Sequence, residues 1–220
     1  VARMAAGLRR LGIGPGDVVA IYLPNIPEAA VALLAIPRIG AIVLPLFSGF
    51  GADAVVTRLN DARAKAVITV DGSLRRGRVV AAKQVIDEAR VRVPSLEHVV
   101  VCHRIDAPMQ WTPGSDHHWR DLVADTGGDR SALPVDADTA FLLVYTSGTT
   151  GRPKGVVHTH CGFPVKTVLD LGICMDFKPT DRILWMSDMG WLVGPILVYG
   201  TTLMGGTMVL AEGTPDYPRS

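Results

Sequence analysis

The expected fold starts from residues 14–46, which read GPGDVVAIYLPNIPEAAVALLAIPRIGAIVLPL. A Gly-Pro-Gly-Asp turn precedes an apolar, β-rich run at residues 18–23, which predicts a strand. A proline and a glutamate open the next segment and a glycine follows its end, so residues 27–38 are expected to form a helix. A second apolar run at residues 41–46 then completes a strand-helix-strand unit.

The same alternation continues along the chain. Helices are expected at residues 52–62 and 79–90, and strands at residues 66–70, 98–101 and 140–145. Near-continuous apolar strands that alternate with helices are typical of a parallel sheet covered on both faces. The expected fold class is therefore α/β, with mostly parallel sheets layered with helices.

The composition excludes several classes of protein. Of the 220 residues, 48% are hydrophobic and 20% are charged, which excludes wholesale disorder. Lys and Arg number 22 against 21 Asp and Glu, a net charge of +1, so nucleic acid is not an expected partner. The three cysteines form no C-x-x-C pair, which argues against a disulfide framework or a cysteine metal site and favours a reducing cytoplasm.

One uncharged stretch, residues 189–211, is long enough to span a bilayer, which takes about 20 apolar residues. Five glycines, one proline and three threonines interrupt it. This pattern predicts a buried helix, a turn and a strand rather than a membrane span. We therefore expect no membrane partner.

A glycine- and hydroxyl-rich loop, YTSGTTGRPKG at residues 145–155, lies between two apolar runs. Its glycines let backbone N–H groups approach an anion, its hydroxyls donate hydrogen bonds, and Lys154 supplies a charge, so the composition suits phosphate. The spacing is not that of the G-x-x-x-x-G-K-[ST] loop, and Pro153 and Gly155 disfavour an immediate helix. A solvated turn has the same composition and stays open as an alternative.

The string Y-T-S-G-T-T-G-x-P-K-G resembles the signature loop of the adenylate-forming superfamily, which includes acyl-CoA synthetases, luciferases and adenylation domains of peptide synthetases. The resemblance implies that the loop grips the phosphates of ATP while a carboxylate attacks the α-phosphate. It implies Lys154 and Thr149 as catalytic residues. The ATP-phosphate residues that it implies are Thr146, Ser147, Gly148, Thr149, Thr150, Gly151 and Lys154.

Further blocks resemble the acetyl-CoA synthetase branch of that superfamily. They read GDVVAIYLPN at residues 16–25, SLEHVVV at 95–101, WMSDMGWLVG at 185–194 and EGTPDYP at 212–218. The likeness implies the large N-terminal domain of the family. Residues 1–220 are accordingly expected to be an incomplete N-terminal, AMP-binding domain, truncated on its C-terminal side and without the C-terminal domain.

The likeness also implies contacts with the acid and with CoA. Trp191, Leu192 and Val193 would line the acyl pocket; from the residues alone, an aromatic side chain in an apolar run is more often part of the core, and this stays open as the alternative for Trp191. Arg75 and Arg78 stand where acetyl-CoA synthetases place arginines for the nucleotide end of CoA. A solvated basic turn is the alternative for this pair.

Two departures from the branch limit what the likeness implies. The Leu192-Val193 pair is larger and less polar than the pair of acetate-specific members, so the acyl group is not fixed as acetate. Residues 46–51, LFSGFG, also differ from the usual glycine pair at that landmark. His158 and His160 alternate after the loop but lack a third ligand of matching spacing, so no metal site is expected.

The expected function is that of an AMP-forming acid–thiol ligase, an acyl-CoA synthetase that uses ATP, Mg²⁺ and CoA with a small carboxylic acid. Carboxylate and ATP would give acyl-AMP and pyrophosphate, and CoA would then give acyl-CoA and AMP. Two alternatives stay open: an adenylating enzyme that passes the acyl group to a carrier protein, and a non-catalytic fragment. The family's adenine, ribose and metal motifs and its C-terminal lysine are expected beyond residue 220, so we expect the 220-residue chain to be inactive alone.

Overall fold

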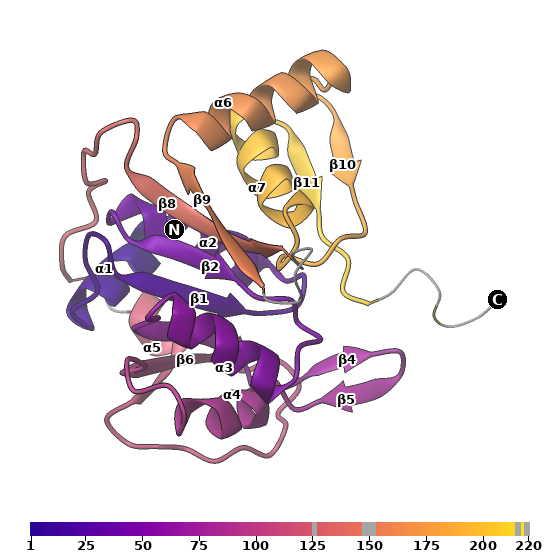
Figure 1. Cartoon of the computed structure of the whole chain (residues 1–220). Coiled ribbons are helices and arrows are strands. Elements are labelled where there is room, and N and C mark those ends of the chain that lie inside the picture. The colour runs from indigo at the N-terminus through magenta and orange to yellow at the C-terminus, as the bar shows by residue number, and fades with distance from the viewer. Residues whose placement is uncertain (125–126, 147–152, 214–216, 218–220) are drawn as a thin grey trace.

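The computed structural model describes residues 1–124, 127–146, 153–213 and 217 (Figure 1). Its helices are α1 (Ala2–Arg10), α2 (Pro27–Arg38), α3 (Ala52–Asp61), α4 (Ala82–Arg90), α5 (Trp119–Ala124), α6 (Gly162–Leu169), the π-helical turn η1 (Asp170–Cys174) and α7 (Val193–Leu203). Its strands are β1 (Val18–Tyr22), β2 (Ile42–Pro45), β3 (Ala66–Val70), β4 (Ser73–Arg75), β5 (Arg78–Val80), β6 (His98–Cys102), β7 (Asp116–His118), β8 (Ala140–Thr146), β9 (Lys154–Thr159), β10 (Arg182–Leu184) and β11 (Thr207–Val209).

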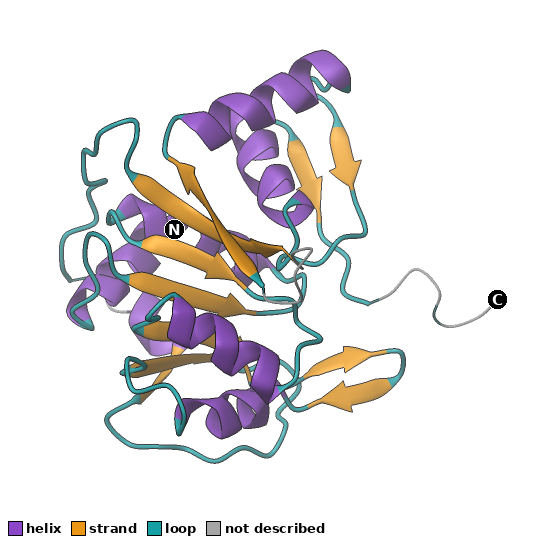
Figure 2. Cartoon of the chain, in the orientation of Figure 1, coloured by secondary structure: helices purple, strands orange, loops and turns teal. Residues whose placement is uncertain are grey.

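The described residues form a seven-stranded sheet in the order β7-β6-β3-β1-β2-β8-β9. Its neighbouring strands are parallel, except that β9 runs antiparallel to β8. Helices α1, α2 and α5 cover one face and α3 and α4 the other (Figures 1 and 2). All five residues of β3 are buried, as expected for a strand covered on both faces. The α/β class and the layered, mostly parallel sheet are thus confirmed.

The first strand-helix-strand unit follows its sequence signals closely. Helix α2 has the expected bounds, and its first residue, Pro27, needs no hydrogen-bond partner for a backbone N–H. Gly40 follows the helix with φ of 75°, a left-handed conformation that favours glycine. Its N–H donates to the Pro37 carbonyl at 2.9 Å, so the chain turns sharply into β2.

The expectation of a helix over residues 79–90 is wrong at its start. Arg76 and Gly77 have φ of 49° and 71°, and together they form a two-residue turn that pairs Arg75 with Arg78. Two positive φ values in succession suit the right-handed twist of a hairpin, so β4 and β5 pair antiparallel. Val79 and Val80 therefore lie in a strand, and the helix begins only at Ala82.

The last part of the described chain forms a smaller parallel sheet of β10 and β11, beside α6 and α7 (Figure 1). Helix α7, a turn and β11 account for residues 193–209, so the predicted helix, turn and strand are confirmed for this stretch. Of the helices in the described ranges, none combines the length and the apolar character that crossing a membrane requires.

Lys83 of α4 carries a buried charge that ties this helix to β7. Its ammonium lies 2.8 Å from the Asp116 carboxylate and 2.6 Å from Asp87, and it donates to the Gln110 carbonyl at 3.1 Å. Arg90 contacts Asp116 at 3.0 Å. The side chains of Lys83 and Asp116 are both 0% exposed, so each charge depends on buried partners instead of water.

We predict that Asp116→Ala lowers the free energy of unfolding by about 3 to 5 kcal/mol, because it removes the fully buried counter-charge of Lys83. Asp53→Ala is the matched control. The Asp53 carboxylate lies 2.7 Å from Arg92, but its side chain is 92% exposed. Its loss should cost less than about 1 kcal/mol. Urea unfolding curves measure both values, and equal losses would contradict the buried-pair account.

Candidate functional site

The loops that follow β1, β2 and β3 meet at one edge of the sheet, which we call the carboxyl edge. Pro24 and Asn25 follow β1, Phe47 and Ser48 follow β2, and Arg75 ends the strand that comes after β3. From β1 the chain continues into α2 on one face of the sheet, and from β3 it continues through the hairpin to α4 on the other. Neighbouring parallel strands whose connections leave toward opposite faces create the crevice in which α/β proteins bind ligands.

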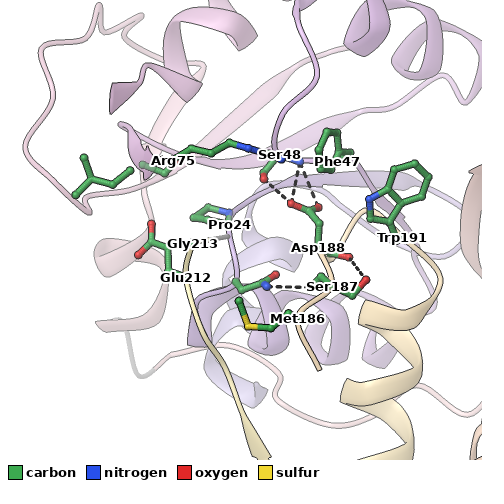
Figure 3. Close-up of a pocket in the computed structure, with 13 residues that line it drawn as sticks. Pro24, Phe47, Ser48, Arg75, Met186, Ser187, Asp188, Trp191, Glu212 and Gly213 are labelled. Atoms are coloured by element: carbon green, nitrogen blue, oxygen red, sulfur yellow. Dashed lines mark hydrogen bonds between the residues drawn. The ribbon is translucent and has the colours of Figure 1, made fainter. Parts of the chain in front are cut away.

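A cavity of about 320 Å³ opens at this edge (Figure 3). Besides the loops after β1, β2 and β3, the segment between β10 and α7 and the chain after β11 contribute to its wall. Its lining residues are Pro24, Asn25, Phe47, Ser48, Ser73, Leu74, Arg75, Met186, Ser187, Asp188, Trp191, Glu212 and Gly213. The Asn25 amide donates to the carbonyls of Ser187 and Ala211 at 2.8 and 3.3 Å, so it joins three of these segments.

The Asp188 carboxylate lies in the wall of the cavity and accepts hydrogen bonds from two segments of the chain. The Ser48 backbone N–H lies 3.2 and 3.3 Å from its two oxygens, the Ser48 hydroxyl donates to it, and the Gly190 N–H donates at 2.8 Å. Burial raises the pKa of Asp188 above the ordinary aspartate value, against the opposing effect of these donors and of the Arg75 charge.

Gly190 lies where two backbone segments approach closely. A Cβ atom at this position would lie 2.1 Å from the Phe47 nitrogen and 2.4 Å from the Leu46 carbonyl carbon. Both neighbours are backbone atoms, so no side-chain rotation could relieve the overlap. Glycine is therefore required for the segment before α7 to contact the loop after β2.

Arg75, Phe47 and Trp191 form a row along the cavity. The Arg75 guanidinium lies 4.8 Å from the centre of the Phe47 ring, a cation–π contact, and that ring lies 5.6 Å from the Trp191 ring. Trp191 is 48% exposed, so it lines the cavity and does not fill the core. The structure thus brings Arg75, which the family resemblance assigned to CoA, and Trp191, which it assigned to the acyl group, into the wall of one cavity.

The other residues of those two groups lie outside the cavity wall. Arg78 pairs with Arg75 across the β4–β5 hairpin and is exposed. The two therefore lie on opposite strands of a hairpin, on either side of its turn. Leu192 is 40% exposed, and Val193 begins α7.

Most of the expected phosphate loop, residues 147–152 with Ser147, Gly148, Thr149, Thr150 and Gly151, lies outside the described residues. Its flanking residues are described. Thr146 ends β8 and pairs with Lys154, which begins β9, and both are exposed. Because β8 runs parallel to β2, this pair lies at the carboxyl edge of the sheet. Strand β9 confirms that no helix follows the loop directly.

Sequence reasoning missed Asp188 and Ser48 as site residues. One local signal was present, because Asp188 is the only charged residue between Arg182 and Glu212. An acid isolated in a long apolar stretch is costly to bury and therefore needs hydrogen-bond donors. Nothing local identifies Ser48 as the donor, since 140 residues separate the two.

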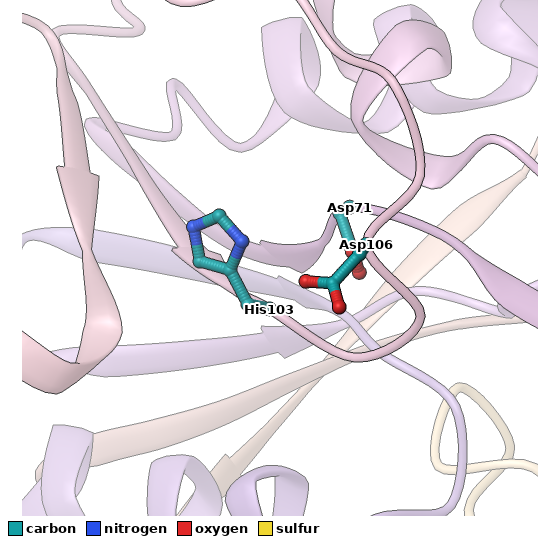
Figure 4. Close-up of side chains that lie close together, drawn as sticks. All are labelled: Asp71, His103 and Asp106. Atoms are coloured by element: carbon teal, nitrogen blue, oxygen red, sulfur yellow. The ribbon is translucent and has the colours of Figure 1, made fainter.

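A second group of side chains, Asp71, His103 and Asp106, lies near the carboxyl end of β6 (Figure 4). The buried Asp71 carboxylate accepts hydrogen bonds from backbone N–H groups in the loop after β6, at 2.8 and 3.0 Å. The Nε2 atom of His103 lies 2.9 Å from Nδ1 of His118. Because Asp71 and His103 already have protein partners, we interpret Asp71 as the anchor of this loop.

Comparison with known proteins gives three findings. A family model described as AMP-binding enzyme matches residues 1–220. The acetyl-coenzyme A synthetases of Rhodopirellula baltica and Escherichia coli are 44% and 42% identical to this chain, over 99% of its length. A structure of acetoacetyl-CoA synthetase from Streptomyces lividans superimposes with a TM-score of 0.89 at 34% identity, over 99% of this chain and 33% of its own. The chain spans 33% and 34% of the two curated relatives, about one third of their length.

We predict that Gly190→Ala lowers the free energy of unfolding by about 1 to 3 kcal/mol, because its new methyl group would overlap the backbone of Leu46 and Phe47. Gly14→Ala is the matched control. A Cβ atom at Gly14 would meet nothing within 4 Å. Its effect should stay within about 0.5 kcal/mol. Urea unfolding measures the free energy of unfolding of both variants. Equal losses in the two would contradict the close approach of Gly190 to the backbone of Leu46 and Phe47.

Proposed function

The chain belongs to the AMP-binding enzyme family, and on this premise we propose that it is part of an ATP-dependent acyl-CoA synthetase. That enzyme joins a carboxylate to ATP, which gives acyl-AMP and pyrophosphate. It then transfers the acyl group to the CoA thiol with release of AMP. In this proposal residues 1–220 contribute part of the N-terminal, AMP-binding domain.

The observation that carries the proposal is the match, over 99% of the chain, to proteins named acetyl-coenzyme A synthetase. The fold supports it independently, because the structural neighbour is also a CoA synthetase by name. The exposed thiols of Cys161 and Cys174 are free, which favours the reducing cytoplasm as the place where the enzyme works.

Lys154 is the residue of this chain that we assign to the phosphates of ATP, together with the hydroxyls and glycines of residues 146–151. Lys154 begins β9 at the carboxyl edge of the sheet, and it is exposed. Adenylation brings an anionic carboxylate to an anionic polyphosphate, so a cation beside the departing phosphates lowers the barrier. ATP enters as its Mg²⁺ complex, so the metal ion is part of the substrate.

The cavity is the part of the site that we assign to CoA and to the acid. Arg75 and Arg78 present two guanidinium groups from one hairpin, and this suits the 3′-phosphate of CoA. The pantetheine arm would pass Phe47, with the thiol and the acyl group on the Trp191 side of the cavity. A carrier protein would not require two cations here, so the arginine pair favours CoA as acceptor.

The experiment that tests the proposal is acid-dependent exchange of labelled pyrophosphate into ATP, with the full-length enzyme and a panel of carboxylic acids. Exchange with at least one small acid, followed by CoA-dependent formation of AMP, is the expected result. Exchange without any response to CoA would instead support transfer to a carrier protein. No exchange with any acid would refute the proposed function.

We predict that Lys154→Ala slows adenylation by about tenfold to hundredfold, the effect of losing one charge-assisted contact. Thioester formation from preformed acyl-AMP should change much less, because the phosphates have already left. Lys178→Ala is the matched control, since Lys178 is exposed and paired with Asp176 at 2.5 Å. Rapid-quench measurement of each half-reaction separates the two steps. Equal slowing of both would count against Lys154 as a phosphate ligand.

We predict that Arg75→Ala and Arg78→Ala each raise the KM for CoA, by about tenfold for Arg75 in the cavity wall and less for the exposed Arg78. Because salt screens a phosphate contact, the effect should be largest at low ionic strength. Pyrophosphate exchange should stay near normal.

Dephospho-CoA provides the control for this pair. Wild-type enzyme should prefer CoA over dephospho-CoA, and the double variant should lose that preference. If the double variant discriminates as well as the wild type, the arginines are surface charges without a role in CoA binding.

A further inference from the structure

Asp188 links two loops that are far apart in the sequence. Its carboxylate accepts from the Ser48 backbone N–H and hydroxyl in the loop after β2, and from the Gly190 N–H in its own segment. Its backbone carbonyl accepts from the Trp191 N–H at 3.1 Å. One residue therefore fixes the loop after β2 on one side and the backbone of Trp191 on the other (Figure 3).

The loop after β2 in turn supports Arg75. The guanidinium lies over the Phe47 ring at 4.8 Å, and a Cβ atom at Gly49 would lie 2.7 Å from its Nη1 atom. Arg75 is thus in contact with two residues of the loop that Asp188 holds. A shift of this loop would move the surface against which the guanidinium packs.

The opposite end of this loop has a separate anchor. The Tyr22 hydroxyl donates to the Phe50 carbonyl at 2.7 Å, and burial, with the nearby Asp188 charge, raises the pKa of Tyr22 to about 12. The hydroxyl therefore remains a neutral donor. Because Tyr22 holds the end at Phe50, Asp188 determines the position of the part that carries Phe47 and Ser48.

The charge of the Asp188 carboxylate strengthens this contact. Ser48 and Gly190 both present backbone N–H groups, and the Ser48 hydroxyl donates as well. Asparagine could accept both backbone N–H groups on its single oxygen, but its NH₂ group would have to donate to the Ser48 hydroxyl, which would then accept instead of donate. The substitution therefore reverses this contact and removes the charge from all three hydrogen bonds, which weakens the hold on the loop.

We propose that Asp188 is a positioning residue that sets the distance between Arg75 and Trp191, and thereby the affinity of the cavity for CoA. The proposal rests on the proposed function, since it takes the ligand of the cavity to be CoA. Asp188 itself contacts no reacting atom. The Asp188 side chain acts through the loop after β2, whereas the contact with Trp191 is made by the backbone carbonyl, which Asp188→Asn leaves in place. The effect of the substitution is therefore expected in CoA binding and not in the adenylation step.

The experiment compares Asp188→Asn, Ser48→Gly and Arg75→Ala in the full-length enzyme. Asp188→Asn should raise the KM for CoA by about tenfold and leave pyrophosphate exchange within about threefold of the wild type. Ser48→Gly keeps the backbone donor, so it should raise that KM by only about threefold. Asp176→Asn, an exposed aspartate that pairs with Lys178, is the matched control and should leave both values unchanged.

The decisive variant combines Asp188→Asn with Arg75→Ala. Because Asp188 acts through Arg75, adding Asp188→Asn to Arg75→Ala should raise the KM for CoA by less than about twofold. A full tenfold additional increase would overturn the proposal, because it means that Asp188 acts independently of Arg75. An equal loss of pyrophosphate exchange in Asp188→Asn would also overturn it, because that result means a general structural role. Thermal unfolding shows whether each variant is folded. If Asp188→Asn does not fold, Ser48→Gly takes its place, and the KM for CoA is measured for Ser48→Gly alone and in combination with Arg75→Ala.

The two levels of inference fail in different ways. If the wild-type enzyme shows no acid-dependent exchange, the proposed function is wrong and this proposal falls with it. If the wild type shows exchange and uses CoA, but Asp188→Asn and Ser48→Gly keep the wild-type KM for CoA, only the positioning role is wrong.

Discussion

Parallel pairing of β1 with β2 and β3 is the constraint on which the rest of the molecule depends. Parallel neighbours need crossover connections, so α2, α3 and α4 occupy the faces of the sheet and the loops at strand ends meet at its edges. The carboxyl edge therefore gathers residues that are far apart in the sequence, from Asn25 to Arg75. The cavity follows from this topology before any particular side chain is considered.

The parts of the fold that could be predicted have strong local signals. Strand β3 and helix α2 have the expected bounds, because apolar runs are enclosed by turn residues that stop them. The error at residues 79–90 has a physical cause. Its hairpin turn places Arg76, which is not a typical turn residue, at positive φ, and only pairing with β4 makes Val79 and Val80 extended.

The site was predictable to a similar extent. The motif at residues 145–155 and the blocks around Arg75 and Trp191 predicted a chemistry and a family, and the family is confirmed. Their arrangement around one cavity depends on contacts across the sheet, which no local pattern contains. Asp188 illustrates the limit, because an isolated acid in an apolar stretch signals a need for donors but does not say where those donors lie.

In the function that we propose, the carboxyl edge of this sheet contributes to the binding of the ligands of both half-reactions, adenylation and thioester formation. A crystal structure of the full-length enzyme with CoA and a non-reactive acyl-adenylate analogue tests it most directly. The account predicts the CoA phosphate beside Arg75, the pantetheine arm along Phe47, and the adenylate phosphate on the side of Lys154. CoA bound on another face, with the cavity left to solvent, would contradict it.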